Sequence, residues 1–151
     1  MHHTAPDHTI TATELVEKLK DFYRDIPSTP LDRIHHIYDQ DVVFKDPIHE
    51  IRGIDAMHAY MLNMCANVSE GRFEFLDQQV GAGNAYLKWN MHFRHPKLGD
   101  QLISVRGVSH LQFADRVHYH EDIYDMGEMI YEHLPLLGTC TRWLKKRLAN
   151  S

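Results

Sequence analysis

Apolar residues recur at helical spacing through the first part of the chain, where we expect three helices. Thr11 and Glu14 stand in the relation of a capping box and introduce a helix that runs to about residue 25. Thr29-Pro30 introduces a second helix, because threonine is a good N-cap and proline fits the first helical turn. A third helix opens at Gly53. Its apolar stripe is predicted to consist of Ile54, Met57, Met61, Met64 and Val68.

From Arg72 onward apolar and polar residues alternate, which predicts strands. Turn signals rich in Gly, Asn, Asp and Pro separate four such runs. The predicted strands are Arg72 to Val80, Ala85 to Arg94, Gln101 to Phe113 and Arg116 to Tyr124. Short connections between consecutive strands are typical of an antiparallel meander. A further brief strand is expected earlier, from Asp41 to Lys45.

The stretch from Met129 to Leu148 again has helical spacing, and Pro135 and Gly138 are expected to kink or divide it. Helices followed by a run of strands indicate an α+β fold. We therefore expect one domain over residues 1–151. Within it, residues 1–10 are expected to be disordered and residues 126–151 to form a C-terminal helical extension.

Composition narrows the class of protein. The 151 residues are 43% hydrophobic and 25% charged, which is ordinary for one globular domain. A net charge of -5 argues against a nucleic-acid partner, because phosphate binding needs a basic stripe. No segment has the apolar run of a secretory signal or a membrane span, so we expect a cytoplasmic protein. Cys65 and Cys140 lack ligand-like neighbours and are expected to be small buried hydrophobes in a reducing compartment.

Two parts of the chain carry a resemblance to a known family. The run Tyr38 to Pro47, YDQDVVFKDP, followed by Gly53 and a helix, resembles the link between the second and third helices of ketosteroid isomerases and SnoaL-like polyketide cyclases. Two later segments, Val105 to Asp115 and His120 to Asp125, resemble the last two strands of the SnoaL-like group, in which an H-x-D pattern recurs.

This resemblance covers roughly Leu15 to Asp125 and implies the nuclear transport factor 2-like fold. That fold is a cone-shaped roll of three N-terminal helices packed on a curved antiparallel sheet, here with a C-terminal helix added. Its interior pocket binds a small molecule. Because the fold hosts enzymes, binding modules and transport factors alike, the resemblance indicates the cone more specifically than the activity.

Asp46 is the first candidate for chemistry. It directly precedes a proline at the end of a short apolar strand, which leaves its backbone little freedom. The resemblance implies that Asp46 is a general base, the role of the matching position in ketosteroid isomerases. The alternative is an Asx turn, a common use of Asp-Pro, in which the carboxylate only caps the exit from the strand.

On the last predicted strand, His118, His120, Asp122 and Tyr124 are spaced by two and should share one face. If that face lines the cavity, His120 and Asp122 can form a hydrogen-bonded acid/base pair. The resemblance implies the catalytic acid/base role for Asp122. In the alternative, this face meets solvent and the core is formed by Val117, Tyr119 and Ile123; the period of two does not decide between them.

Further site residues follow from the same resemblance. Tyr23 or Phe22 falls where the isomerases keep a tyrosine that donates to a developing oxyanion, and the sequence leaves both open. Ser109 stands where the isomerases hold a protonated acid, and a serine hydroxyl is a poorer donor there. True ketosteroid isomerisation is therefore not expected.

Trp89, Met91 and Phe93 alternate on the second strand of the meander and form either a pocket wall or plain core. The spacing His118-x-His120-x-Asp122 offers three ligands, but it is not a specific metal signature, and we expect neither a metal nor a cofactor. The expected substrate-binding residues are Tyr38, Phe44, Trp89, Met91, Ser109, His118 and Tyr124.

These residues support two hypotheses about function. The first is a cofactor-independent isomerase, cyclase or hydratase that acts by proton transfer on a carbonyl-containing small molecule. Asp46 and Asp122 would be its working carboxylates, His120 the orienting partner and Tyr23 the oxyanion donor. The second is a non-catalytic ligand-binding or protein-interaction module of the same fold.

Two surfaces complete the expectations. The outer face of the sheet mixes apolar, aromatic and polar residues, which predicts a homodimer through that face. The run Arg142 to Leu148 is basic and amphipathic, which suits an anionic membrane surface or a partner but is too short for stable membrane attachment. Alternatively, its cations simply complement the helix macrodipole.

Overall fold

The N-terminal part of the molecule contains three helices, as the sequence predicts, but the second is only one turn long and Thr29 does not cap it. The computed structural model describes residues 10–99 and 101–150. Helix α1 (Ala12–Phe22) begins at the predicted capping box, in which Thr11 and Glu14 exchange side-chain to backbone hydrogen bonds. The 3-10 turns η1 (Ile26–Ser28) and η2 (Leu31–Arg33) lead into the single-turn helix α2 (Ile34–Ile37). The longer helix α3 (Ile54–Asn67) follows two strands later.

Six strands form one curved sheet in the order β2-β1-β6-β5-β4-β3. The first two are β1 (Tyr38–Lys45) and β2 (Glu50–Arg52). The meander consists of β3 (Glu70–Val80), β4 (Asn84–Arg94), β5 (Ile103–Phe113) and β6 (Val117–Tyr124), and η3 (Pro96–Leu98) lies between β4 and β5. The four strands predicted after Arg72 are confirmed, with ends shifted by one or two residues.

The expectation of a wholly antiparallel sheet is wrong at one pair of strands. β1 and β6 pair in parallel, whereas all the other pairs are antiparallel. The last strand of the meander, β6, lies beside β1 and runs in the same direction, although the two strands are far apart in sequence. Strand β2 was not predicted, because its three residues are too few to show a period of two.

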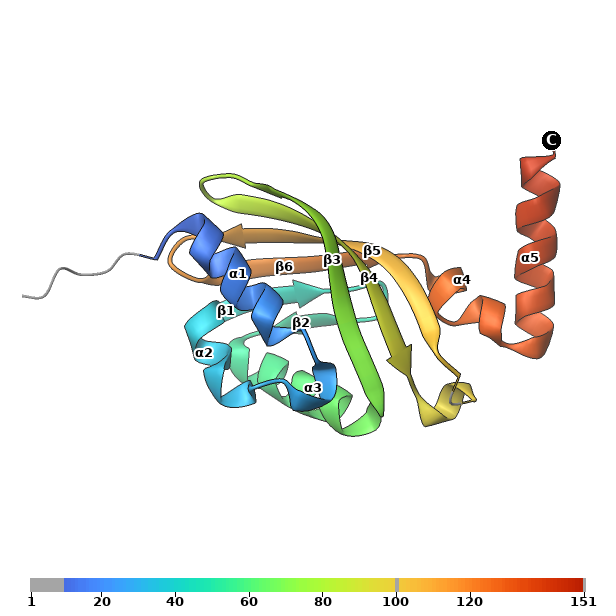
Figure 1. The fold of residues 1–151 in the computed structure, drawn as a ribbon, viewed down its shortest axis with the longest axis horizontal. Coiled ribbons are helices and arrows are strands. Elements are labelled where there is room, and N and C mark those ends of the chain that lie inside the picture. Colours follow the sequence, from blue (N-terminus) through green and yellow to red (C-terminus); the bar gives the residue numbers. More distant parts are fainter. Residues whose placement is uncertain (1–9, 100, 151) are drawn as a thin grey trace, which may run out of the picture.

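The inward residues of the meander follow the alternation that the sequence predicts. On β5 every second residue from Ile103 to Phe113 is buried. On β4 the buried residues are Ala85, Leu87, Trp89 and Phe93. Helices α1, α2 and α3 lie together against one side of the curved sheet (Figure 1), while the opposite side stays open. The expected cone-shaped α+β architecture is confirmed.

The core lies between these helices and the sheet. From α1 it takes Leu15, Val16, Leu19 and Phe22, and from α3 it takes Ile54, Met57 and Met61. Partly buried Ile10 packs against this core. The disorder expected for residues 1–10 otherwise concerns residues 1–9, which lie outside the described residues.

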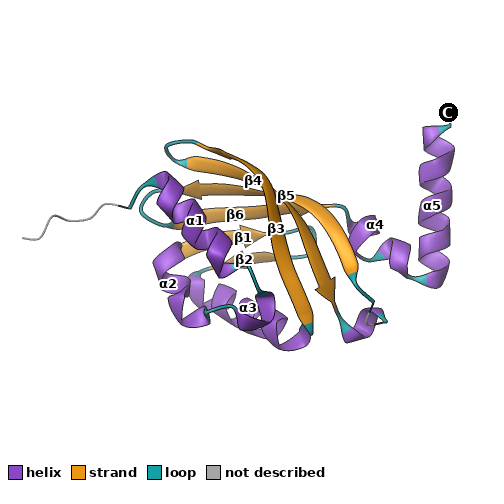
Figure 2. Cartoon of the chain, viewed as in Figure 1, coloured by secondary structure: helices purple, strands orange, loops and turns teal. Residues whose placement is uncertain are grey.

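The C-terminal extension is helical but divided into three pieces. They are α4 (Met126–Met129), the 3-10 turn η4 (Tyr131–His133) and α5 (Pro135–Ala149). Pro135 starts α5 rather than kinking it, since proline fits the first helical position. Helix α5 stands apart from the sheet and the other helices (Figure 2).

Two further observations concern this segment and the helices in general. Cys140 is exposed, so the expectation that it is a buried hydrophobe is wrong, and Cys65 is only partly buried. Both thiols are free. Among the described helices, none is long and apolar enough to cross a bilayer.

Candidate functional site

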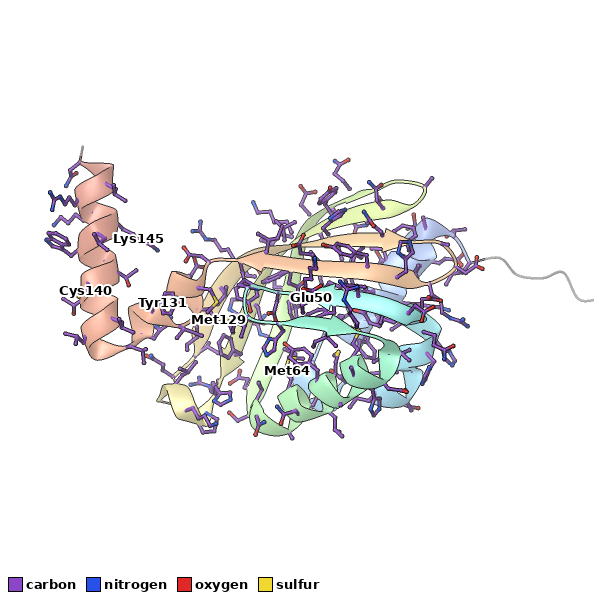
Figure 3. All side chains as sticks on the ribbon, turned by 180° about the vertical axis from the view of Figure 1, so that it is seen from behind. Glu50, Met64, Met129, Tyr131, Cys140 and Lys145 are labelled. Atoms are coloured by element: carbon purple, nitrogen blue, oxygen red, sulfur yellow. The ribbon has the colours of Figure 1, made fainter. Side chains whose placement is uncertain are left out.

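A small cavity opens between α3, the inner face of the sheet and α4. Its volume is about 70 Å³, which is room for a few waters or a small molecule. Met64 of α3 and Met129 of α4, labelled in Figure 3, lie on its wall. The other lining residues are Tyr23, Phe44, Asp46, Tyr60, Met61, Phe73, Trp89, Met91, Asp122 and Tyr124.

Two carboxylates, Asp46 and Asp122, are the acidic groups of this wall. Among the described residues that line the cavity, none is Lys, Arg or His. The remaining polar groups are tyrosine hydroxyls and the sulfur atoms of methionine. A ligand in the cavity therefore meets two acids within a largely aromatic enclosure.

Asp46 forms the Asx turn that the sequence left open and also lies on the cavity wall. Its Oδ1 accepts hydrogen bonds from the backbone N–H groups of Ile48 at 2.8 Å and His49 at 2.6 Å, which is the geometry of an Asx turn. The same side chain is only 5% exposed and lines the cavity. The turn thus fixes the carboxylate and does not remove it from the cavity wall.

Tyr60 is a site residue that the sequence reasoning missed. Its hydroxyl donates to Oδ2 of Asp46 at 3.3 Å, and its ring packs on Phe44. Burial, followed by the charge of Asp46, raises the pKa of Tyr60 above its ordinary value, so the hydroxyl keeps its proton. The available signal was its position on α3. Tyr60 lies three residues after Met57 and four before Met64 of the apolar stripe, and residues so spaced are neighbours on a helix surface.

On β6 the pair His120 and Asp122 is formed as predicted. His120 Nε2 lies 2.7 Å from Oδ1 of Asp122, and His120 is only 2% exposed. Three rings hold the imidazole in place: Tyr38 stacks on it at 5.9 Å, while Phe44 and Tyr23 meet it edge to face at 5.0 Å and 5.9 Å.

Ser109 supports the acid of this pair from the neighbouring strand. It lies directly opposite Asp122 in the β5–β6 register, and its hydroxyl donates to Asp122 Oδ1 at 2.5 Å. The same hydroxyl oxygen accepts the indole N–H of Trp89 at 2.8 Å. Ser109 is therefore buried behind the cavity wall, as a support for Asp122 rather than as part of the cavity lining.

Tyr38 and Tyr23 extend the network on the other side of the imidazole. The Tyr38 hydroxyl lies 2.8 Å from His120 Nδ1 and 2.5 Å from the Tyr23 hydroxyl. Tyr23 also points its hydroxyl at the sulfur of Met61, 3.6 Å away. Between the two residues that the sequence left open, Tyr23 lines the cavity, whereas Phe22 packs in the core behind it.

The hydrogen bonds of this network have a direction. A carboxylate can only accept, so His120 Nε2 carries a proton toward Asp122 and a neutral His120 accepts at Nδ1 from Tyr38. Tyr38 in turn accepts from Tyr23. Burial raises the pKa values of both tyrosines, with the neighbouring hydroxyl a further cause for Tyr38, so both remain neutral donors. The donors thus all point toward Asp122.

The expectation for His118 is wrong. A bulge shifts the register between Phe113↔Val117 and Gln112↔Tyr119, which leaves His118 as an extra residue on β6. The alternation reverses at that point, so Val117 and His120 both face inward and His118 is exposed. Tyr124 remains on the inner face and lines the cavity.

The remaining predicted residues fall on two sides of the cavity wall. Phe44, Trp89 and Met91 line it, whereas Tyr38 lies behind it in the network.

Among the described residues, no group of three or more His, Cys, Asp or Glu side chains is arranged to hold a metal ion.

Comparisons with known proteins identify a family and a shared fold. The family model of the SnoaL-like domain matches residues 19–118. Comparison with curated protein sequences finds no significant match.

Several solved structures share the fold at low sequence identity. A protein from Shewanella putrefaciens, described as a SnoaL-like polyketide cyclase, is 18% identical with a TM-score of 0.67, over 78% of this chain and 92% of that one. An NTF2-like protein of unknown function from Burkholderia pseudomallei is 15% identical with a TM-score of 0.69, over 79% and 94%. A protein with a ketosteroid isomerase-like fold from Catenulispora acidiphila, in complex with trimethylamine, is 11% identical with a TM-score of 0.67, over 78% and 90%.

Proposed function

This chain belongs to the SnoaL-like domain family, and we propose that it is a cofactor-independent enzyme that moves a proton on a small carbonyl compound. The observation that carries the proposal is the pair of carboxylates, Asp46 and Asp122, on the wall of one mostly aromatic cavity. Two acids held in different surroundings can separate the tasks of base and acid. Isomerisation, aldol-type cyclisation and hydration can all use such a pair as acid and base.

Each residue has a part in this proposal. Asp46, fixed by its turn and by Tyr60, would take the proton beside the carbonyl group. Asp122, positioned by His120 and Ser109, would enter the reaction with a proton on Oδ2 and give it to the substrate; Oδ1 accepts both hydrogen bonds before and after this transfer. The proton taken by Asp46 would then leave to solvent, and Asp122 would take one up, which restores both groups. Tyr23 would donate to the developing oxyanion by turning its hydroxyl from Tyr38 toward the ligand.

Hydrogen–deuterium exchange tests the proton transfer without knowledge of the natural substrate. A panel of small cyclic ketones is incubated with the protein in D₂O, and loss of the signal of the hydrogens beside the carbonyl group is followed by proton NMR. We expect catalysed exchange, with at least a hundredfold loss in Asp46→Asn, in line with the usual contribution of general acid–base catalysis. Asp41→Asn is the matched control, because Asp41 is an exposed carboxylate on β1, the strand that ends just before Asp46. Unchanged exchange in both Asp46→Asn and Asp122→Asn would refute the assignment.

A second candidate is a non-catalytic binding module for a small organic cation. Two carboxylates, several aromatic rings and no cationic lining residue favour an ammonium group over an anion. The Catenulispora protein, which shares the fold, binds trimethylamine. Calorimetry with trimethylammonium and with acetone separates the candidates: tight binding of the amine alone, lost in Asp46→Asn, would favour the module.

We also propose a cytoplasmic homodimer that pairs through the outer face of the sheet. There Tyr86 stacks on His110 with ring centres 4.5 Å apart, and Ile123 is 56% exposed. Sedimentation velocity at micromolar protein and pH 7 tests this: a monomer would exclude the dimer.

A further inference from the structure

Helix α5 presents an apolar surface to solvent. We call it the apolar face of α5 and define it as Leu136, Leu137, Trp143 and Leu144. Each of these residues is at least half exposed, from 50% for Leu137 to 78% for Leu136. At 100° per residue they fall within one arc of the helix, of about 120°. A contiguous apolar patch of this kind marks a binding surface more often than a scatter of single residues does.

The charge of this helix is opposite to that of the rest of the chain. Residues 135–149 contain four Lys and Arg and no Asp or Glu, which leaves 12 Lys and Arg against 21 Asp and Glu elsewhere, a net charge of -9. Arg147 falls within the same arc, near the C-terminal end of the helix, and its guanidinium lies over the ring of Trp143 at 5.3 Å. Lys146 lies beside the face, about 60° around the helix from Trp143. An aromatic and leucine surface bordered by Lys and Arg is the pattern of helices that lie in the interface of a bilayer.

The position of α5 leaves its apolar face accessible to a bilayer surface. Its principal neighbour is η4, and it projects away from the sheet (Figure 1). Lys145 points toward the rest of the molecule in Figure 3 and pairs with Asp125 at 3.3 Å, which anchors the helix on the side away from the apolar face. The acidic remainder of the chain therefore lies away from a surface that α5 binds. Salt screens the repulsion between this remainder and a negatively charged surface at distances beyond about 8 Å.

We propose that α5 binds reversibly to an anionic lipid bilayer through its apolar face and cations. A second copy of the chain is a poorer binding partner for this face. Four side chains at about 100 Å² each cover about 400 Å², half of the roughly 800 Å² per subunit that a stable dimer buries. A bilayer needs no such matching surface, because the lipid tails accept the apolar side chains and the anionic headgroups attract the cations.

Vesicle binding by the full chain tests this directly. Trp143 is 57% exposed and Trp89 only 1%, so a shift of tryptophan emission to shorter wavelength on binding reports Trp143. We expect this shift, and co-sedimentation, with vesicles of equal parts phosphatidylglycerol and phosphatidylcholine, and neither with phosphatidylcholine alone. Leu136→Glu with Leu144→Glu should weaken binding at least tenfold. Neutralising two surface cations, Lys146→Gln with Arg147→Gln, should weaken it about 25-fold.

Leu62→Glu is the matched control, because Leu62 is about as exposed as Trp143, at 54% against 57%, but lies on α3, away from both α5 and the outer face of the sheet. This variant should bind vesicles like the unmodified chain. Three results would each overturn the proposal: no binding to the anionic vesicles, equal binding to phosphatidylcholine alone, or equal loss in Leu62→Glu. A lower sedimentation coefficient of Leu136→Glu with Leu144→Glu in the absence of lipid would instead assign the face to a second copy, which also overturns it.

Discussion

Replacing Tyr38 by phenylalanine tests whether the buried network is one connected unit. The change removes a single oxygen and leaves the ring, so it creates almost no cavity. That oxygen bonds both His120 Nδ1 and the Tyr23 hydroxyl, and Tyr38 is only 1% exposed. Its pKa is raised well above the ordinary value, first by burial, so the neutral hydroxyl is the form lost at any ordinary pH.

The expected cost follows from the groups left behind. His120 Nδ1 would keep no donor in an interior that is closed to water, and an unsatisfied buried group costs about 1–3 kcal/mol. Tyr23 would lose its strong bond but keep the weak one to Met61. We therefore expect Tyr38→Phe to lower the free energy of unfolding by about 2–3 kcal/mol. For a domain of this size, that lowers the melting temperature by about 4–12 °C.

Tyr23→Phe is the comparison, because it removes a hydroxyl from the end of the same chain of hydrogen bonds. Tyr38 would then still donate to His120, so the cost should be about 1 kcal/mol. Urea denaturation of both variants and of the double variant gives the coupling between the hydroxyls. A cost for Tyr38→Phe no larger than that for Tyr23→Phe would refute the direction assigned to the network.

Three further predictions concern packing, capping and the bulge. Gly107→Ala should destabilise by about 2 kcal/mol or more in thermal denaturation, because a Cβ there would lie 2.2 Å from the indole of Trp89; a neutral result would mean that the ring can move. Burial acts to raise the pKa of Asp125, but hydrogen bonds from two backbone N–H groups and a lysine outweigh it and lower the pKa. The stabilisation by this cap is therefore fully present above the pKa of Asp125 in the unfolded chain and is lost as pH falls through its lower pKa in the folded chain. Asp125→Ala should cost about 1 kcal/mol at pH 7 in urea titrations, and less once the pH is below the folded-state pKa. Finally, His118→Ala should leave stability and the NMR spectrum of the cavity unchanged, whereas His120→Ala should disturb both; a response to His118→Ala would contradict the exposed position on β6.

The sequence determined those features of the fold that depend on local periodicity. The capping box at Thr11, the four strands after Arg72 and the inward set on β5 follow from spacings of about 3.6 and of 2. The same alternation put His120 on one face with Asp122, since residues two apart share a face in regular strand, but it did not decide whether that face is inward. Ser109 and Asp46 came from the resemblance to ketosteroid isomerases, to which the sequence added that the proline after Asp46 restricts its backbone.

What periodicity could not determine depends on contacts between distant segments. The bulge at His118 reverses the alternation of β6, and it arises from pairing with β5 and with β1, not from the sequence of β6 itself. The parallel pairing of β1 with β6 brings Tyr38 beside His120, 82 residues away in sequence. The packing of α3 over β1 likewise brings Tyr60 to Asp46. Only tertiary structure decides such pairs, because hydrogen bonds between side chains on different elements depend on how those elements pack, and a single sequence shows only how each element repeats.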